Sequence, residues 1–457
     1  MKTRDFIPNL HIYQELFFSQ FTKVATKQKD RNFSHSILLY RVESSQFSLC
    51  CFSFRGHCEN SAYPPQCILK GLALASSAFI LCSCSTVNVP IPSSEPTTVY
   101  FAGVSFTGNF RDRFTNYPNS YSLAANGRLD KAFVAELQKH QFKKIILETS
   151  LGESTHASDA VSASLGIDLE TVSGSHVDGV GYKTVADIYA QVFVFNFDTK
   201  KILTSIPINL QYITVTPKRP NREQVKQIFE AMIFGTDERV KESLLELAAK
   251  KLETLEVQQD YGTRYKVEKV EFSDQANKTI RSFSINADQF KTITAQMLTR
   301  SLADNLNVAV VPYTKGEAIG SKMPARFANG DAFTFELPPA DYAFDLKFHN
   351  FNTKRNTSNP ALDTEAYIVF TNVKFEQPDL QKEFLNRNFR AAATNTLVKG
   401  QKSDPQVVYL ETIFNFFEGL AKNIEDPETS WLKTVVHPDN VSTTKEQLEA
   451  IHDQMFR

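Results

Sequence analysis

The chain carries an apparent internal repeat, and this feature constrains its fold most. Each copy begins with an alternating, strand-like segment, continues with a helical pattern and returns to a second strand. The paired segments are 98–109 with 264–275, 127–141 with 287–305, and 142–149 with 307–313. The helical segments are separated by 160 residues. This order predicts two copies of one mixed unit, and a coincidental match of two ordinary layouts is the alternative.

A hairpin is expected next in each copy. Residues 190–202 align with 342–356. In this sequence alignment Asn196–Lys201 matches Asn350–Arg355, 154 residues further along the chain. Because Asp and Asn favour reversals, both runs predict turns. Returning strands are expected at 203–215 and 364–376, and helices at 221–235, 237–257, 378–398 and 406–424.

The expected fold class is therefore α+β. Two similar strand–helix–strand–hairpin units, each a mixed sheet covered by helices, are predicted at 99–260 and 261–440, with 441–457 as a C-terminal helix or tail. A formal net charge of −1 gives no electrostatic reason to expect a nucleic-acid partner. We expect no cofactor, and the sequence leaves the oligomeric state open.

All six cysteines, from Cys50 to Cys84, fall within 35 positions, and none follows. A disulfide framework would distribute cysteines through the fold, so this pattern argues against one. The uncharged run Gly71–Leu81 follows Lys70 and is too short to cross a bilayer comfortably. Its length suits the apolar region of a signal peptide, and a buried core helix is the alternative. The cysteine-free body behind it favours export.

The residues Leu81–Cys84 resemble the lipobox of bacterial lipoprotein precursors, with a small residue before the modified cysteine. The resemblance implies that 67–84 is a signal peptide, that Cys84 is acylated and that Ser85 directs the protein to the outer membrane, facing the periplasm or the cell surface. Cys82 fits the pattern less well. Acyl chains at about 0.8 kcal/mol per buried methylene anchor a protein stably. Residues 85–98, rich in Ser, Thr and Pro, form the expected tether.

Residues 1–66 do not belong in such a precursor. An over-extended start, with translation beginning near Cys67 or Ile68, is one explanation. A genuine cytoplasmic extension, which would make the apolar run an internal anchor, is the other.

The repeated unit is similar to periplasmic domains of curli-secretion-type and penicillin-binding-protein-activator lipoproteins. The residues that carry the resemblance are Ala190–Thr199, which follow the hairpin pattern A-x-V-x-V-x-x-x-D. The resemblance implies a scaffold that binds partners in the cell envelope, without catalytic residues.

One segment offers candidate chemistry, the Gly-rich stretch 173–187 with His176 and Asp178. A His-x-Asp pair can bind a metal ion or join a base to its orienting carboxylate. A solvated surface loop is the simpler interpretation. A looser group, Glu148, His156 and Asp159, is expected to be exposed.

The sequence therefore predicts a lipid-anchored envelope protein that acts through protein–protein contacts as a scaffold, assembly or secretion-accessory protein. Its expected partners are the membrane, through the lipid, and other envelope proteins. An envelope hydrolase or metal-dependent enzyme that uses residues 173–187 is the alternative.

Overall fold

The structure, a computed structural model, describes residues 96–108, 110–149, 160–177, 179–257, 263–314 and 322–456. They belong to one compact unit, Val87–Arg457. The predicted leader, signal peptide and Cys84 lie outside the described residues, as does nearly all of the tether.

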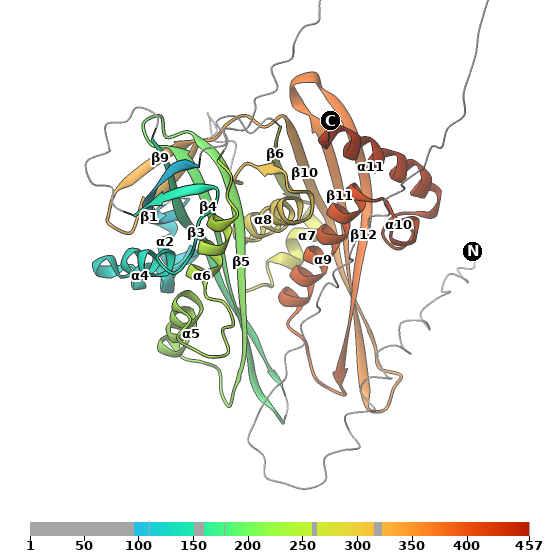
Figure 1. Cartoon of the computed structure of the whole chain (residues 1–457). Helices are drawn as coiled ribbons and strands as arrows, with labels where there is room; N and C mark the ends of the chain where they lie inside the picture. Colours follow the sequence, from blue (N-terminus) through green and yellow to red (C-terminus); the bar gives the residue numbers. More distant parts are fainter. Residues whose placement is uncertain are drawn as a thin grey trace, which may run out of the picture. The chain divides into compact units, whose positions relative to one another are not determined.

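A single mixed sheet of twelve strands organises the described part of the chain (Figure 1). The strands are β1 (Thr97–Thr107), β2 (Ile145–Glu148), β3 (Val161–Val177), β4 (Gly181–Asn196), β5 (Ile202–Thr216), β6 (Arg264–Phe272), β7 (Ala309–Val310), β8 (Lys322–Phe327), β9 (Ala332–Glu336), β10 (Tyr342–Asn356), β11 (Leu362–Gln377) and β12 (Lys382–Val398). Their order is β12-β11-β10-β6-β7-β5-β4-β3-β1-β8-β9, and β2 pairs with β1.

The two halves of the sheet repeat one topology. In the first half, β1 is parallel to β2 and β3, and β3, β4 and β5 follow as an antiparallel meander. In the second half, β6 is parallel to β7 and β10, and β10, β11 and β12 follow in the same way. The α+β class is confirmed. Independent folding of units 99–260 and 261–440 stays a prediction.

The ten described α-helices are α2 (Arg113–Asn116), α3 (Pro118–Leu123), α4 (Arg128–Leu137), α5 (Arg222–Phe234), α6 (Leu244–Glu253), α7 (Asp274–Ile280), α8 (Ala287–Leu306), α9 (Pro405–Glu425), α10 (Thr429–Val435) and α11 (Val441–Met455). Among them, polar side chains cap the first turn of α5, α6, α7, α8 and α9. Asn221 and Asn286 form capping boxes at α5 and α8, and Asp404 caps α9 ahead of Pro405. Single 3-10 turns lie at Phe110–Asp112, Ala125–Gly127, Pro378–Leu380 and Pro438–Asn440.

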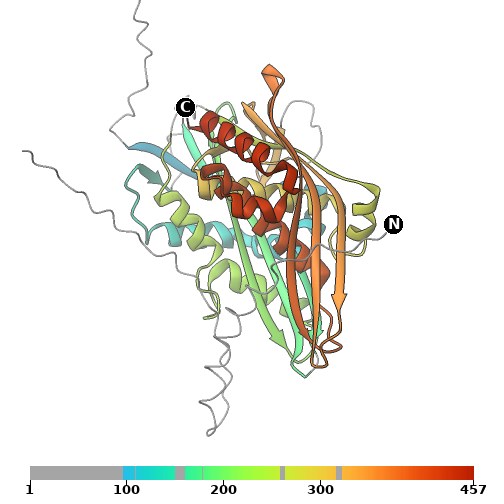
Figure 2. The same ribbon diagram turned by 90° about the vertical axis from the view of Figure 1, so that its right-hand side faces the viewer.

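Two large apolar cores follow the two halves. The first lies between β1, β3, β4 and β5 and the helices α3, α4, α5 and α6. The second lies between β6, β10, β11 and β12 and the helices α7 to α11. Figure 2 shows the C-terminal helices in red against the long orange strands. Leu169 of β3 and Tyr189 of β4 also join the second core, so α8 contacts strands of both halves.

Three local predictions are wrong. Residues 382–398 of the predicted helix 378–398 form the strand β12. The predicted turn at Asn350–Arg355 lies inside β10. Residues 197–201 connect the last two strands of the first meander, β4 and β5. The corresponding turn of the second meander is the β11–β12 connection at Pro378–Gln381. The predicted loop 173–187 is mostly strand. Residues 173–177 end β3, residues 181–187 begin β4, and the two strands pair with each other.

Candidate functional site

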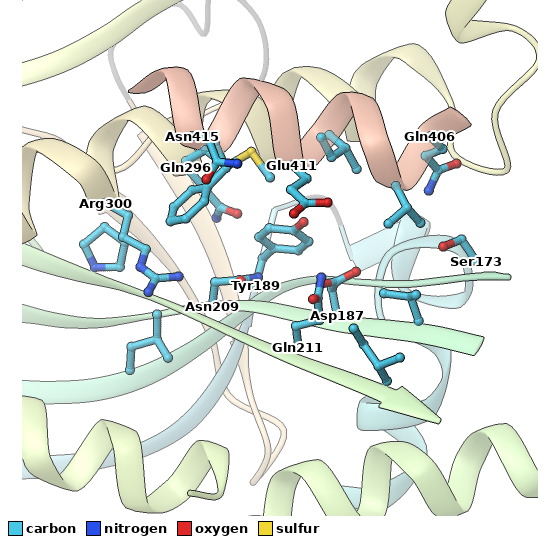
Figure 3. Close-up of a pocket in the computed structure, with 18 of the residues that line it drawn as sticks. Ser173, Asp187, Tyr189, Asn209, Gln211, Gln296, Arg300, Gln406, Glu411 and Asn415 are labelled. Atoms are coloured by element: carbon cyan, nitrogen blue, oxygen red, sulfur yellow. The ribbon is translucent and has the colours of Figure 1, made fainter. Parts of the chain in front are cut away.

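A cavity of about 470 Å³ lies where the first-half strands β4 and β5 face the second-half helices α8 and α9 (Figure 3). This volume is within the range of ligand-binding pockets, roughly 300–1,000 Å³. The lining residues are Ser173, Lys183, Val185, Asp187, Tyr189, Pro207, Ile208, Asn209, Gln211, Ile213, Gln296, Met297, Arg300, Gln406, Val407, Leu410, Glu411, Phe414 and Asn415. Polar groups and apolar walls therefore meet in one cavity.

Strand alternation determines which side chains reach the cavity. Asp187 of β4 lies directly opposite Gln211 of β5, and their neighbours two residues away share the same face. The intervening residues Ala186, Ile188 and Tyr212 turn to the other face and join the first core. Figure 3 shows Asp187 and Gln211 on the strands below α9, with Glu411 above them on the helix.

Asp187 is the cavity's most unusual group, because it is a carboxyl with only 7% of its surface exposed. Gln211 Nε2 donates to its Oδ1 at 2.9 Å, and the Thr171 hydroxyl donates to its Oδ2 at 3.3 Å. Burial raises the pKa of Asp187 to about 6, against these two hydrogen bonds. Both partners are neutral, and Asp187 forms no ion pair with any of the described residues.

A second buried carboxyl, Asp168, connects the strands to α8. It is the extra residue of a β-bulge in β3, which changes the pairing with β4 between Ile167 and Leu169. Gln191 and Gln296 donate to its two oxygens at 2.9 and 2.5 Å, and the Thr107 hydroxyl also donates to it. Burial raises the pKa of Asp168 to about 6. The Oε1 of Gln296 is buried and accepts no hydrogen bond within the described residues.

Glu170 serves a different purpose on the opposite face of β3. Its carboxylate accepts from the backbone N–H groups of Asn119 and Ser120, at the start of α3, and from both of their side chains. Burial raises the pKa of Glu170 to about 7. These contacts fix α3 to the sheet, so we assign Glu170 a structural role.

A second, more open cavity of about 700 Å³ adjoins the first and shares Ser173 and Gln406 with it. Its remaining lining comes from α3, the ends of β3 and β4, the segment between α7 and α8, and the starts of α5 and α9 with the residues just before them. The two cavities together form a cleft between the halves, which we call the central cleft.

The predicted site residues are placed as follows. His176 lies at the exposed end of β3, opposite Tyr182 of β4, and lines neither cavity. Asp178 and Cys84 lie outside the described residues, as do His156 and Asp159, whereas Glu148 is exposed at the end of β2. Of the predicted His-x-Asp pair only His176 is described, and it lies outside both cavities.

Sequence reasoning missed Asp168, Glu170 and Asp187. Acidic residues inside segments of strand-like length were the signal that could have identified Asp168 and Asp187. Throughout the residues that the structure describes, no three His, Cys, Asp or Glu side chains are grouped to hold a metal ion. None of the described helices is long and apolar enough to cross a membrane.

No family model and no curated protein sequence matches the chain. Among solved structures, a hypothetical protein from Chlamydia trachomatis matches with a TM-score of 0.23 and 8% identity, over 35% of this chain and 96% of that one. A minor lipoprotein from Acinetobacter baumannii matches with a TM-score of 0.19 and 14% identity, over 36% and 92% of the two chains. Rare lipoprotein B from Shewanella oneidensis matches with a TM-score of 0.18 and 12% identity, over 41% and 99%. At these scores and identities no property of the three proteins is transferred to this chain.

Proposed function

We propose that the protein is a lipid-anchored component of the cell envelope that binds a partner protein in the central cleft. The sequence supports the anchor through the lipobox-like Leu81–Cys84 and the Ser/Thr/Pro-rich segment behind it. The anchor holds the body near a membrane, and the body acts by contact with other envelope proteins.

The observation that carries the binding proposal is the cavity between β4, β5, α8 and α9. It lies where the two halves of the sheet meet, and clefts at such junctions are common ligand sites. Its lining mixes aromatic and aliphatic side chains with amides and charges, as protein-binding surfaces do.

Binding explains the buried acids better than structure alone does. Asp187 gives up hydration without an opposite charge in return, which is costly for folding. Groups of this kind concentrate at functional sites, where the cost is tolerated for the sake of a ligand. By contrast, Glu170 holds a helix in place and needs no ligand to explain it.

Acylation is tested by metabolic labelling with a fatty-acid probe. The wild-type protein should be labelled and should fractionate with membranes, whereas Cys84→Ala should lose the label and accumulate as precursor. Label retained in Cys84→Ala would refute acylation at this residue. Cys82→Ala serves as the matched control and should remain labelled.

Partner binding is tested in the producing cells by photo-crosslinking. A photoreactive amino acid replaces Ile213 of β5, which lines the cavity and is 46% exposed. Ile146 of β2, 48% exposed and outside the cavity, is the control position. We expect a discrete adduct from position 213 that is absent from position 146. Equal adducts from both positions, or none from position 213, would contradict the proposal.

A further inference from the structure

The cleft also indicates what kind of partner segment it accepts. Four features of the described residues matter: the uncompensated carboxyl of Asp187, the charges around it, the unsatisfied acceptor of Gln296, and an open strand edge on β5. The inference rests on the proposed partner binding and adds the chemistry of the bound segment.

The carboxyl of Asp187 lines the cavity and is bonded only by Gln211 and Thr171. Other ionisable groups on the cavity walls are Lys183 and Tyr189 on β4, Arg300 on α8 and Glu411 on α9. Arg300 is already engaged, because its Nε donates to Asp304 at 3.2 Å and its guanidinium lies over the Phe414 ring. Lys183 forms no ion pair with Asp187.

The cavity therefore has acceptors in excess. Asp187 offers an ionised carboxylate, and the buried Oε1 of Gln296 offers an acceptor that no described donor uses. The nearby carboxyl of Asp168 is bonded by Thr107, Gln191 and Gln296, all of them neutral. A cationic side chain that enters from outside would supply the missing opposite charge and donors.

The open edge of β5 supplies a place for the backbone of such a segment. Only Ser205 of β5 pairs with β7, and no described strand pairs with the outer edge from Ile206 to Thr216. Proteins normally cover or interrupt edges of this length. Pro207, which cannot donate a hydrogen bond, interrupts this edge only near its start.

Geometry connects the edge with the carboxyl. Asp187 lies opposite Gln211, so one strand separates it from a segment that would pair with β5. Neighbouring strands are about 4.8 Å apart, which places the added strand about 10 Å from β4. A Lys or Arg beside Gln211 on the added strand reaches over β5 towards Asp187, whereas a short side chain does not.

We propose that the central cleft binds an extended peptide segment of a partner protein, which adds to the β5 edge and places a Lys or Arg side chain against Asp187. Backbone pairing supplies affinity that is independent of sequence, and the cavity supplies selection for one basic residue. Ile213 and Val215, both exposed on β5, provide apolar contact beside the bound strand.

The test uses the full-length protein in detergent and fluorescein-labelled peptides of alternating Ser and Val with one central Lys. Two companion peptides carry norleucine in place of Lys, or methylated backbone nitrogens that prevent strand pairing. Fluorescence anisotropy should show that the Lys peptide binds at least tenfold more tightly than the norleucine peptide. The methylated peptide should not bind.

Asp187→Asn should abolish the preference for Lys and leave binding of the norleucine peptide unchanged. Asp345→Asn, which alters a half-buried carboxyl of β10 outside the cavity, is the matched control and should keep the preference. A second readout needs only the wild type: the preference for Lys should decrease between pH 7.5 and pH 5, as Asp187 is protonated.

Equal binding of the Lys and norleucine peptides to the wild type, or a preference that survives in Asp187→Asn, would overturn the inference. Absence of binding by every peptide would also overturn it. None of these outcomes affects the adduct expected at position 213 in cells, so a failure here is distinguishable from a failure of the proposed function.

Discussion

Replacement of Asp187 by Asn is expected to stabilise the protein at neutral pH while it removes the ligand preference. The amide is nearly the same size as the carboxyl and keeps both hydrogen bonds. Its oxygen accepts from Gln211, and its nitrogen donates to the Thr171 hydroxyl, which can accept as readily as donate. Only the buried charge is lost.

The magnitude follows from the pKa of Asp187, which burial raises from 3.8 to about 6. Below pH 3.8 the carboxyl is protonated in the folded and the unfolded chain, and it has no effect on stability. Between pH 3.8 and 6 the folded chain retains a proton that the unfolded chain has released, so the free energy of unfolding falls as the pH rises. Above pH 6 the penalty is complete, at about 3 kcal/mol.

Urea unfolding of wild type and Asp187→Asn at pH 4, 6 and 8, followed by circular dichroism, measures this difference. The two proteins should be nearly equally stable at pH 4, and Asp187→Asn should be more stable by about 3 kcal/mol at pH 8. Asp379→Asn, an exposed carboxyl at the β11–β12 turn, is the control and should change stability by less than about 0.5 kcal/mol. A variant less stable than wild type at pH 8, or a difference independent of pH, would refute the reasoning.

Three further substitutions test the packing and capping of individual elements. Gly419→Ala should lower the free energy of unfolding by about 1–3 kcal/mol, because a Cβ there would lie 2.5 Å from Nε1 of Trp431; an unchanged unfolding midpoint and Trp431 fluorescence would contradict this. Asn286→Ala removes the capping box of α8 and should cost about 1 kcal/mol in urea unfolding, whereas Asn286→Asp should retain most of it. Gly174→Ala should destabilise by more than Gly179→Ala in thermal melts, since its Cβ would meet the Lys183 carbonyl oxygen at 2.3 Å; equal effects would argue against the β3–β4 pairing.

Much of the architecture could be predicted from the sequence, because strong periodicity survives in the long elements. The helices at 287–305 and 406–424 and the strands at 203–215 and 364–376 were predicted close to their observed positions. Their apolar faces pack directly on the cores, so the pattern of burial and the pattern of residues agree.

The strand β12 could not be predicted in the same way. Its buried residues Leu385 and Phe389 are four positions apart, a spacing that fits a helix as well as a strand. The run Ala391–Ala393 also favours a helix. Pairing with β11 along the whole segment outweighs that local preference, and a single sequence does not reveal a long-range pairing of this kind.

The candidate site was the least predictable part. Ser173, Gly174 and Ser175 indicated a loop, but Gly174 occupies a strand position where the backbone of β4 approaches too closely for a side chain. Asp187 stands at the end of the same segment, and its place in a run of strand-like length was the one local signal of its burial. Its cavity requires α8 and α9, which begin 100 or more residues away in the sequence.

The most direct test of the central claim, that a partner occupies the cleft through Asp187, is in-cell photo-crosslinking from position 213 in two backgrounds. Wild type and Asp187→Asn are compared at equal abundance, with the probe at Ile213 in both. We predict a discrete adduct in the wild type that falls at least tenfold in Asp187→Asn, although that variant is the more stable protein. An adduct of equal yield in both backgrounds would contradict the claim.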